Sequence, residues 1–219
     1  QRLEWDIPNP VQGMRLKKPE GRVRWISREE ADRLIAEATS VRGYLPDFIQ
    51  LGLNTGMRKG EMLGLTWDRV DLDQGMVYLT DRDQKNGKHG SIPLNDDAME
   101  ALKNRMEFRN EHCPKSPWVF AKHNGDRVAE IRKGFKAACK KASIDDFTPH
   151  DMRHTCAAWL VQGGVDIRVV CELLRHSSIE VTMRYAHLSP RNVRDAVECL
   201  SHSRPTAEKT AKRGDSSAS

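Results

Sequence analysis

Apolar residues recur every three or four positions along much of the chain, the spacing of amphipathic helices. Residues 27–30 have the S-x-x-E pattern of a capping box, and the apolar positions that follow it are Ala31, Leu34, Ile35 and Ala38. This pattern predicts a helix that ends at about Thr39. Pro46 opens a second helix, which the Asn-Thr-Gly sequence at 54–56 ends in a turn. A new segment then begins and carries Arg58 in its first turn.

Three short segments have the composition of strands, namely residues 69–72, 76–80 and 90–94. The Asp-Gln-Gly sequence at 73–75 makes a turn between the first two. Asn86-Gly87, the strongest short hairpin signal, lies between the last two. The sequence therefore predicts a small three-stranded antiparallel sheet with Lys85 at the tip of a hairpin.

Helices outnumber strands in the rest of the chain. Asn95 suits the N-cap of one helix, and another follows with Val128, Ile131, Phe135 and Ala138. Four short helices close the chain and begin near Thr148, Asp166, Ser177 and Ser189. Gly163-Gly164 ends the first of these. The predicted fold class is mainly α (α+β), a helical domain with one small sheet.

Composition narrows the classes of protein. Among 219 residues, 36 Lys and Arg oppose 31 Asp and Glu, a formal net charge of +5 that favours a polyanionic partner. No apolar run approaches the ~18 residues that a membrane span requires, and no signal-peptide stretch follows the N-terminus. We expect a cytoplasmic or nucleoid protein with no membrane partner. The 5 cysteines are odd in number and lack C-x-x-C spacing, which favours reduced thiols over disulfides or a thiolate zinc site.

The chain is expected to contain one compact domain between two extended arms. Residues 1–26 are rich in Pro and Gly and look like a linker from an upstream domain. Residues 27–200 form the domain. Residues 201–219 are polar and charged and are predicted to be a disordered tail.

One helix carries a group of candidate binding residues near its start. His150, Arg153 and His154 stand at i, i+3 and i+4, so they share one face close to a helix N-terminus, where an anion is favoured. Two such histidines also suit zinc, but Asp151 and Met152 stand where a metallohydrolase would need its glutamate. Any one of these residues, taken alone, is more often a solvated polar side chain.

A second group follows downstream. His176 precedes a capped helix, and Tyr185 lies on that helix among polar neighbours. The other tyrosines, Tyr44 and Tyr78, lie beside a helix start and within a strand, where both suit packing roles. A lone tyrosine is more often a half-buried anchor than a nucleophile.

The ordered set of motifs resembles the catalytic domain of tyrosine recombinases, the phage integrase family, over about residues 27–200. The motifs are T-G-M-R-K-G-E at 55–61, Lys85 in a hairpin, H-x-x-R-H at 150–154, L-x-H-S-S at 174–178 and T-x-x-Y-x-H at 182–187. The resemblance implies a helical DNA breaking-rejoining domain with the catalytic residues Arg58, Lys85, His150, Arg153, His176 and Tyr185. Members usually have glycine where this chain has Arg175.

The chemistry of phosphodiester exchange fits these residue types. Two planar guanidiniums suit the charge that develops on the non-bridging oxygens, and Tyr185, with a pKa of ~10 in water, needs a base such as His150. The resemblance assigns Lys85 as the acid for the leaving 5′-oxygen and implies a 3′-phosphotyrosine intermediate. That intermediate conserves the energy of the broken bond, so neither a metal nor ATP is expected as a cofactor.

The sequence leaves three rival functions and several partners open. The rivals are a type IB topoisomerase, a non-catalytic DNA-binding relative and a metal-dependent nuclease. The favoured function is a site-specific recombinase, or integrase, of a mobile element. Its expected partners are double-stranded DNA, three further copies in a homotetramer on paired sites, and accessory DNA-bending proteins.

Overall fold

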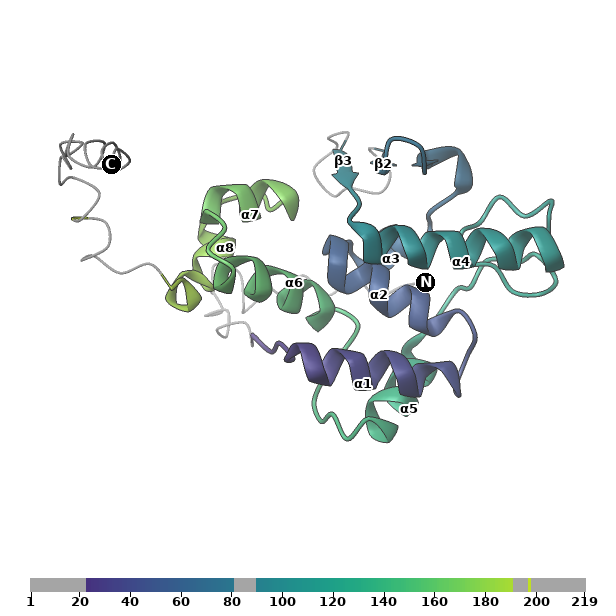
Figure 1. Cartoon of the computed structure of the whole chain (residues 1–219), viewed down its shortest axis with the longest axis horizontal. Coiled ribbons are helices and arrows are strands. Elements are labelled where there is room, and N and C mark those ends of the chain that lie inside the picture. The colour runs from purple at the N-terminus through teal and green to yellow at the C-terminus, as the bar shows by residue number, and fades with distance from the viewer. Residues whose placement is uncertain (1–22, 81–89, 191–196, 198–219) are drawn as a thin grey trace, which may run out of the picture. The chain divides into compact units, whose positions relative to one another are not determined.

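The computed structural model describes residues 23–80, 90–190 and 197. Helices dominate it, and the strands are confined to one small sheet (Figure 1). The elements in chain order are α1 (Arg28–Thr39), α2 (Leu45–Thr55), α3 (Lys59–Leu63), η1 (Trp67–Arg69), β1 (Val70–Asp71), β2 (Met76–Leu79), β3 (Gly90–Pro93), α4 (Asp96–His112), α5 (Arg132–Lys141), α6 (Asp151–Gln162), α7 (Ile167–Leu173), α8 (Glu180–Met183) and η3 (Ala186–Leu188).

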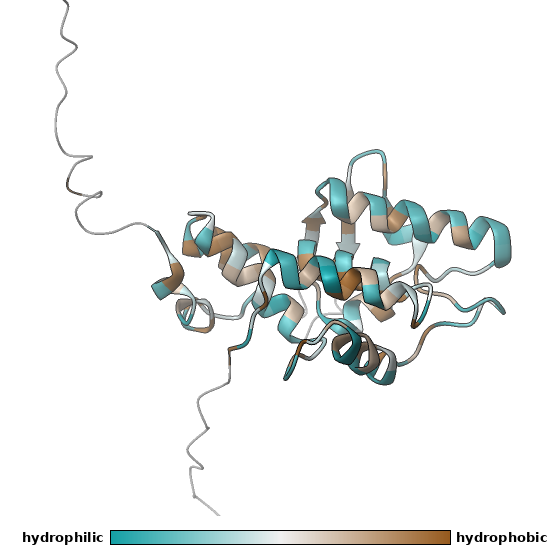
Figure 2. Cartoon of the chain, turned by 60° about the horizontal axis from the view of Figure 1, so that its bottom comes forward, coloured by the Kyte–Doolittle hydropathy of each residue, from teal (hydrophilic) through white to brown (hydrophobic). Residues whose placement is uncertain are grey.

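The chain divides into two compact units, Gln1–Thr155 and Cys156–Ser219, with the boundary inside α6. In the first unit, α2 packs against α1 and α4, and α1 also packs against α5 (Figure 1). The side chains of Phe48, Ile49 and Leu51 on α2 are fully buried. Most helices carry both hydrophilic and hydrophobic residues, as amphipathic packing requires (Figure 2).

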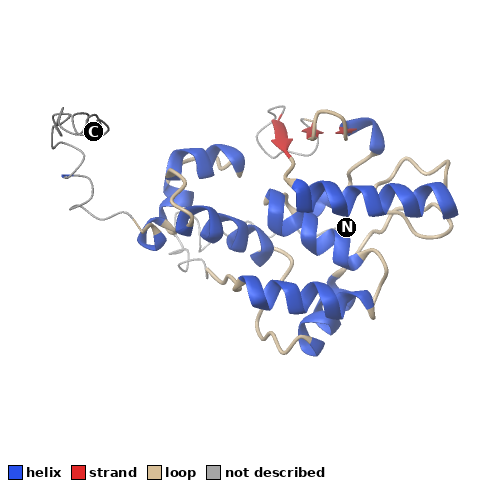
Figure 3. Ribbon diagram, in the orientation of Figure 1, coloured by secondary structure: helices blue, strands red, loops and turns tan. Residues whose placement is uncertain are grey.

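The predicted sheet is confirmed (Figure 3). β1, β2 and β3 pair antiparallel in that order, and Val77 is opposite both Val70 and Ile92. Val77 and Ile92 are fully buried, whereas Tyr78 is 46% exposed, so β2 alternates between core and solvent. Lys85, predicted at the hairpin tip, lies outside the described residues.

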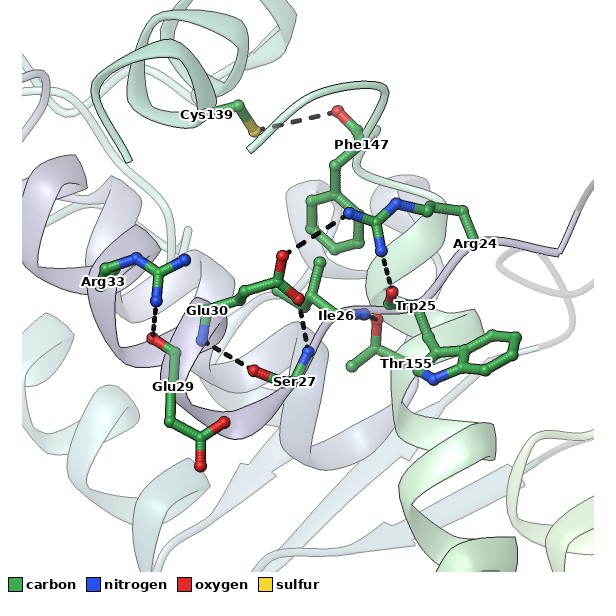
Figure 4. A network of polar contacts seen from close by, with 10 residues as sticks. All are labelled: Arg24, Trp25, Ile26, Ser27, Glu29, Glu30, Arg33, Cys139, Phe147 and Thr155. Carbon is green, nitrogen blue, oxygen red and sulfur yellow. Dashed lines mark hydrogen bonds and ion pairs between the residues drawn. The ribbon is translucent and has the colours of Figure 1, made fainter. Parts of the chain in front are cut away.

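The predicted capping box opens α1 (Figure 4). The Ser27 hydroxyl accepts a hydrogen bond from the Glu30 N–H at 3.1 Å, and the Glu30 carboxylate accepts one from the Ser27 N–H at 2.8 Å. Just before it, Ile26 is fully buried and its N–H donates to Thr155 Oγ1 at 3.3 Å (Figure 4). The packed body therefore includes Ile26, which the sequence assigned to the linker.

The predicted start of α4 is confirmed, whereas the predicted start of α5 is wrong. The Asn95 side chain accepts a hydrogen bond from the Ala98 N–H at 3.0 Å and caps α4, as predicted. α5 begins only at Arg132, with Ile131 at its N-cap. Val128, placed on this helix by its spacing, instead lies in the preceding loop, where its N–H donates to the Phe120 carbonyl at 2.9 Å.

In the second unit, Asp166 caps α7 as predicted, its carboxylate accepting from the Arg168 N–H at 2.8 Å. The predicted cap of the next helix at Ser177 is wrong. α8 begins at Glu180, because the Ile179 carbonyl accepts its first hydrogen bonds, from the N–H groups of Thr182 and Met183. Of the helix predicted from Ser189 onwards, the structure describes only its first two residues and Val197.

Two findings about the described residues bear on protein class. No helix among residues 23–80 and 90–190 combines the length and apolar character that would let it cross a membrane. None of the four cysteines in the described part of the chain forms a disulfide. Burial raises the pKa of the Cys139 thiol to about 11, which keeps that thiol protonated at neutral pH.

Candidate active site

Arg58 lies immediately after a sharp turn. Gly56 follows the last residue of α2 with a left-handed φ of 61°, and Arg58 occupies the position before α3. Its guanidinium Nη1 donates to Glu61 Oε1 at 2.7 Å, and its backbone N–H donates to Glu61 Oε2 at 2.8 Å. The Glu61 side chain is 1% exposed and that of Arg58 is 35% exposed. A buried carboxylate thus fixes the guanidinium while leaving part of it accessible to solvent.

Arg153, on the first turn of α6, is held at the same turn. Its side chain is buried, and Nη1 donates to the Gly56 carbonyl at 2.7 Å. Gly56 is only two residues from Arg58 in the chain. One left-handed glycine therefore positions the segment that carries Arg58 and accepts a hydrogen bond from Arg153, so the structure brings these two predicted residues to one place.

His150 precedes α6 in a tight turn. The Asp151 carboxylate accepts hydrogen bonds from both the backbone N–H and the hydroxyl of Thr148, each at 2.8 Å. Because this closes a turn before the helix, α6 begins at Asp151 rather than at Pro149, as the sequence had predicted. The His150 side chain is exposed, and its ring stands nearly perpendicular to that of His154, at 87° and 4.9 Å between centroids.

Metal ligation finds no further support in the described part of the chain. Among those residues, no three His, Cys, Asp or Glu side chains are grouped in a way that could hold a metal ion. Among the described residues, His150 and His154 have no third His, Cys, Asp or Glu placed to complete a metal site with them.

The second unit positions His176 and Tyr185 through one threonine. His176 Nδ1 forms a hydrogen bond of 2.7 Å with Thr182 Oγ1, and the Tyr185 N–H donates to the Thr182 carbonyl at 3.0 Å. Thr182 itself is fully buried. Tyr185 was predicted to lie on a helix among polar neighbours. It instead follows the end of α8, immediately before η3, and is only 1% exposed.

Sequence reasoning missed the residues that support the predicted ones. Glu61 and Thr182 are buried partners of Arg58 and His176, and the Gly56 carbonyl is the partner of Arg153. The contact of Glu61 could have been predicted from the sequence, because a glutamate three residues after an N-cap typically accepts a hydrogen bond from the backbone N–H of the N-cap residue. The other two contacts follow no such helix-start pattern, since His176 and Thr182 are six residues apart and Arg153 and Gly56 are 97 apart.

A basic helix surface was also missed. α5 buries Phe135, Ala138 and Cys139. Its exposed residues include five cations and no acid: Arg132, Lys133, Lys136, Lys140 and Lys141. The signal is visible in the sequence R-K-G-F-K-A-A-C-K-K, in which every charge is positive.

Comparison with known proteins decides the family. The model of the phage integrase family matches residues 24–192. The chain belongs to the phage integrase family. This match confirms the resemblance that was inferred from the motifs. Structural neighbours confirm the predicted fold, mainly helical with a small antiparallel sheet. The catalytic domain of bacteriophage HP1 integrase has a TM-score of 0.63 at 27% identity over 81% of this chain and 95% of that one.

Other relatives of this phage integrase family member are longer than the chain. The integrase of Salmonella phage P22 is 33% identical over 87% of this chain and 50% of its own length. The tyrosine recombinase XerC of Corynebacterium glutamicum is 33% identical over 74% of this chain and 53% of its own length. The XerA recombinase structure has a TM-score of 0.67 at 26% identity and is covered over 70%. The chain thus spans about half the length of the curated relatives it matches.

Proposed function

We propose that this chain is the catalytic domain of a site-specific DNA recombinase that cleaves and rejoins DNA through a 3′-phosphotyrosine. The observation that carries the proposal is the placement of Arg58 and Arg153 around one turn, each with a fixed guanidinium. The names of the relatives, integrase and tyrosine recombinase, support the reaction class over a topoisomerase or a purely DNA-binding protein.

The two arginines bind the scissile phosphate in this proposal. A five-coordinate phosphorus carries more negative charge on its non-bridging oxygens than the starting phosphodiester does. Guanidiniums that are already oriented by Glu61 and the Gly56 carbonyl need no reorganisation as that charge develops. They therefore stabilise the transition state more than the ground state, which is what accelerates a reaction.

Tyr185 is the nucleophile, and the remaining residues move protons or bind the phosphate. His150, with its exposed ring, accepts the phenol proton, and His176 donates a hydrogen bond to a phosphate oxygen. Lys85, outside the described residues, protonates the departing 5′-oxygen. Because Tyr185 is 1% exposed, its ring has to leave its buried position before the phenol oxygen can reach a DNA phosphate.

DNA is the proposed partner, and α5 is the proposed contact with its backbone. The five exposed cations of this helix suit phosphate binding, whereas its apolar residues anchor it to the core. The structures of the XerH recombinase and the Tn1549 transposon integrase, which share the fold, are both complexes with DNA. Assembly as a homotetramer on paired sites, accessory DNA-bending proteins and a nucleoid location belong to the same proposal.

The test is covalent trapping on nicked suicide DNA, read as a slower band on a denaturing gel. Tyr185→Phe keeps the ring but removes the attacking oxygen, so we expect no adduct while DNA binding by gel shift persists. Tyr78→Phe is the matched control, because Tyr78 is exposed on β2, and it should form adduct like the parent. An adduct that persists in Tyr185→Phe would refute the assignment of the nucleophile.

A further inference from the structure

A pocket of about 900 Å³ lies in the first unit, and none of its lining residues belongs to the candidate active site. Its walls come from the connection between α1 and α2, from α4, from residues 121–130 and from the start of α5. This volume is typical of pockets that take small organic molecules. The proposed recombination chemistry makes no use of the pocket.

Arg105 of α4 lines this pocket and is only 3% exposed. Its Nη1 donates to Asp47 Oδ2 over a long 3.4 Å, and Asp47 also accepts from Asn104 Nδ2 at 3.0 Å. Among the described residues, Arg105 Nε and Nη2 have no hydrogen-bond partner. These two nitrogens form one edge of the guanidinium, the fork that meets a carboxylate or phosphate through two parallel hydrogen bonds.

The charge of the lining also favours an anion. Arg42, Lys122 and Lys133 join Arg105 as cations, whereas Glu130 is the one acid in the lining. The Glu130 carboxylate is already engaged, since Oε1 accepts from the N–H groups of Ile131 and Arg132, both at 2.9 Å. Four cationic groups against one acid suit a doubly charged phosphate monoester better than a single carboxylate.

Aromatic side chains beside Arg105 indicate a ligand with a flat ring. The Phe108 ring lies over the Arg105 guanidinium, 4.2 Å from its central carbon, and the His123 ring is 4.9 Å from that of Phe108. Tyr44 contributes a further wall. Aromatic side chains can stack on nucleobases.

We propose that this pocket binds a nucleoside monophosphate, with the phosphate on the Nε and Nη2 edge of Arg105 and the base against the aromatic wall. Phe108 covers the guanidinium, so the half-buried ring moves aside as the phosphate enters. The pocket shares no candidate catalytic residue with the recombination chemistry proposed above, and Lys133 is the one residue it has in common with the five cations of the proposed DNA contact on α5.

The test is titration of the chain with adenosine 5′-monophosphate, followed by the ¹H–¹⁵N signal of the Arg105 Nε–H and by calorimetry. We expect the Arg105 signal to shift, and ribose 5-phosphate, which lacks the base, to bind at least about threefold more weakly. Arg105→Lys keeps the charge but removes the fork, and its affinity should fall about tenfold or more.

Two surface lysines keep the test decisive if the Arg105 variant does not fold. Lys122→Gln removes a cation from the pocket and should weaken binding about three- to tenfold. Lys136→Gln makes the same charge change on α5 outside the pocket and should have no effect. An Arg105 signal that does not move, or affinity that is equal in parent, Lys122→Gln and Arg105→Lys, would overturn the proposal. So would an equal shift of the Arg105 signal by a short DNA duplex, since the phosphate would then belong to DNA.

Discussion

Two turns in the molecule use the same backbone conformation with different residues. α2 is followed by Gly56 at φ 61°, two residues before Arg58, and α7 is followed by Arg175 at φ 54°, one residue before His176. Each turn thus delivers a candidate catalytic side chain directly after a helix. Glycine adopts this left-handed region without strain, whereas a residue with a Cβ does so at a cost of about 1–2 kcal/mol.

The two turns differ in the hydrogen bond that each one makes besides its left-handed φ. At Gly56 the backbone carbonyl accepts the hydrogen bond of Arg153, so the turn holds two arginines at once. At Arg175 the side chain takes part itself, since its Nη1 donates to the Leu173 carbonyl at 2.8 Å and closes the end of α7. The arginine therefore offsets some of its own backbone strain with a hydrogen bond that glycine could not make.

The largest expected effect is a loss of DNA cleavage when Arg153, which hydrogen-bonds the first turn, is replaced. Arg153→Lys should reduce single-turnover cleavage of suicide DNA about 10²- to 10³-fold, because one ammonium cannot reproduce a planar fork oriented by the Gly56 carbonyl. Binding of uncleaved DNA should change far less. The matched control is Arg127→Lys, an arginine whose guanidinium instead lies against the Trp118 ring. Equal cleavage rates of Arg153→Lys and the parent would show that the hydrogen bond between Arg153 and the Gly56 carbonyl is not needed for catalysis.

Local signals in the sequence were sufficient for much of the fold. Ser27, Asn95 and Asp166 each cap a helix with a side chain that hydrogen-bonds two or three residues ahead, and such contacts need no tertiary structure. The sheet followed from alternation and turn residues for the same reason. Where the N-cap residue has no side chain that can accept a hydrogen bond, as at Ile131 and Ile179, the predicted starts of α5 and α8 were wrong.

The contact that supports Arg153 could not be predicted, because distant parts of the chain make it. Arg153 and Gly56 are 97 residues apart. The near-complete burial of Tyr185 also depends on packing, and the polar neighbours in its sequence do not indicate it. Motifs therefore located the candidate catalytic residues, whereas only the fold shows what orients or covers them.

An intermediate effect is expected at the first turn itself. Gly56→Ala should lower the free energy of unfolding by about 1–2 kcal/mol, because a Cβ is strained at this φ. Urea denaturation followed by tryptophan fluorescence measures it. Gly60→Ala is the control, since Gly60 lies in α3 with nothing within 4 Å of an added Cβ, and it should be neutral or stabilising. Equal stability of both variants would show that the left-handed turn carries no strain.

The smallest effect is expected at the second turn, where two substitutions separate strain from bonding. Arg175→Ala keeps the left-handed strain and loses the hydrogen bond to the Leu173 carbonyl, so the free energy of unfolding should fall by about 1 kcal/mol. Arg175→Gly also loses that bond but relieves the strain, at the cost of about 0.5–1 kcal/mol for the greater freedom of glycine in the unfolded chain.

The terms for Arg175→Gly nearly cancel, so its stability should stay within about 0.5 kcal/mol of the parent and above that of Arg175→Ala. The same urea denaturation, run on all three proteins, gives the order. If glycine proves less stable than alanine at this position, backbone strain is not what distinguishes the second turn. The arginine would then be held there by its side-chain contacts alone, and the likeness between the two turns would end at their φ values.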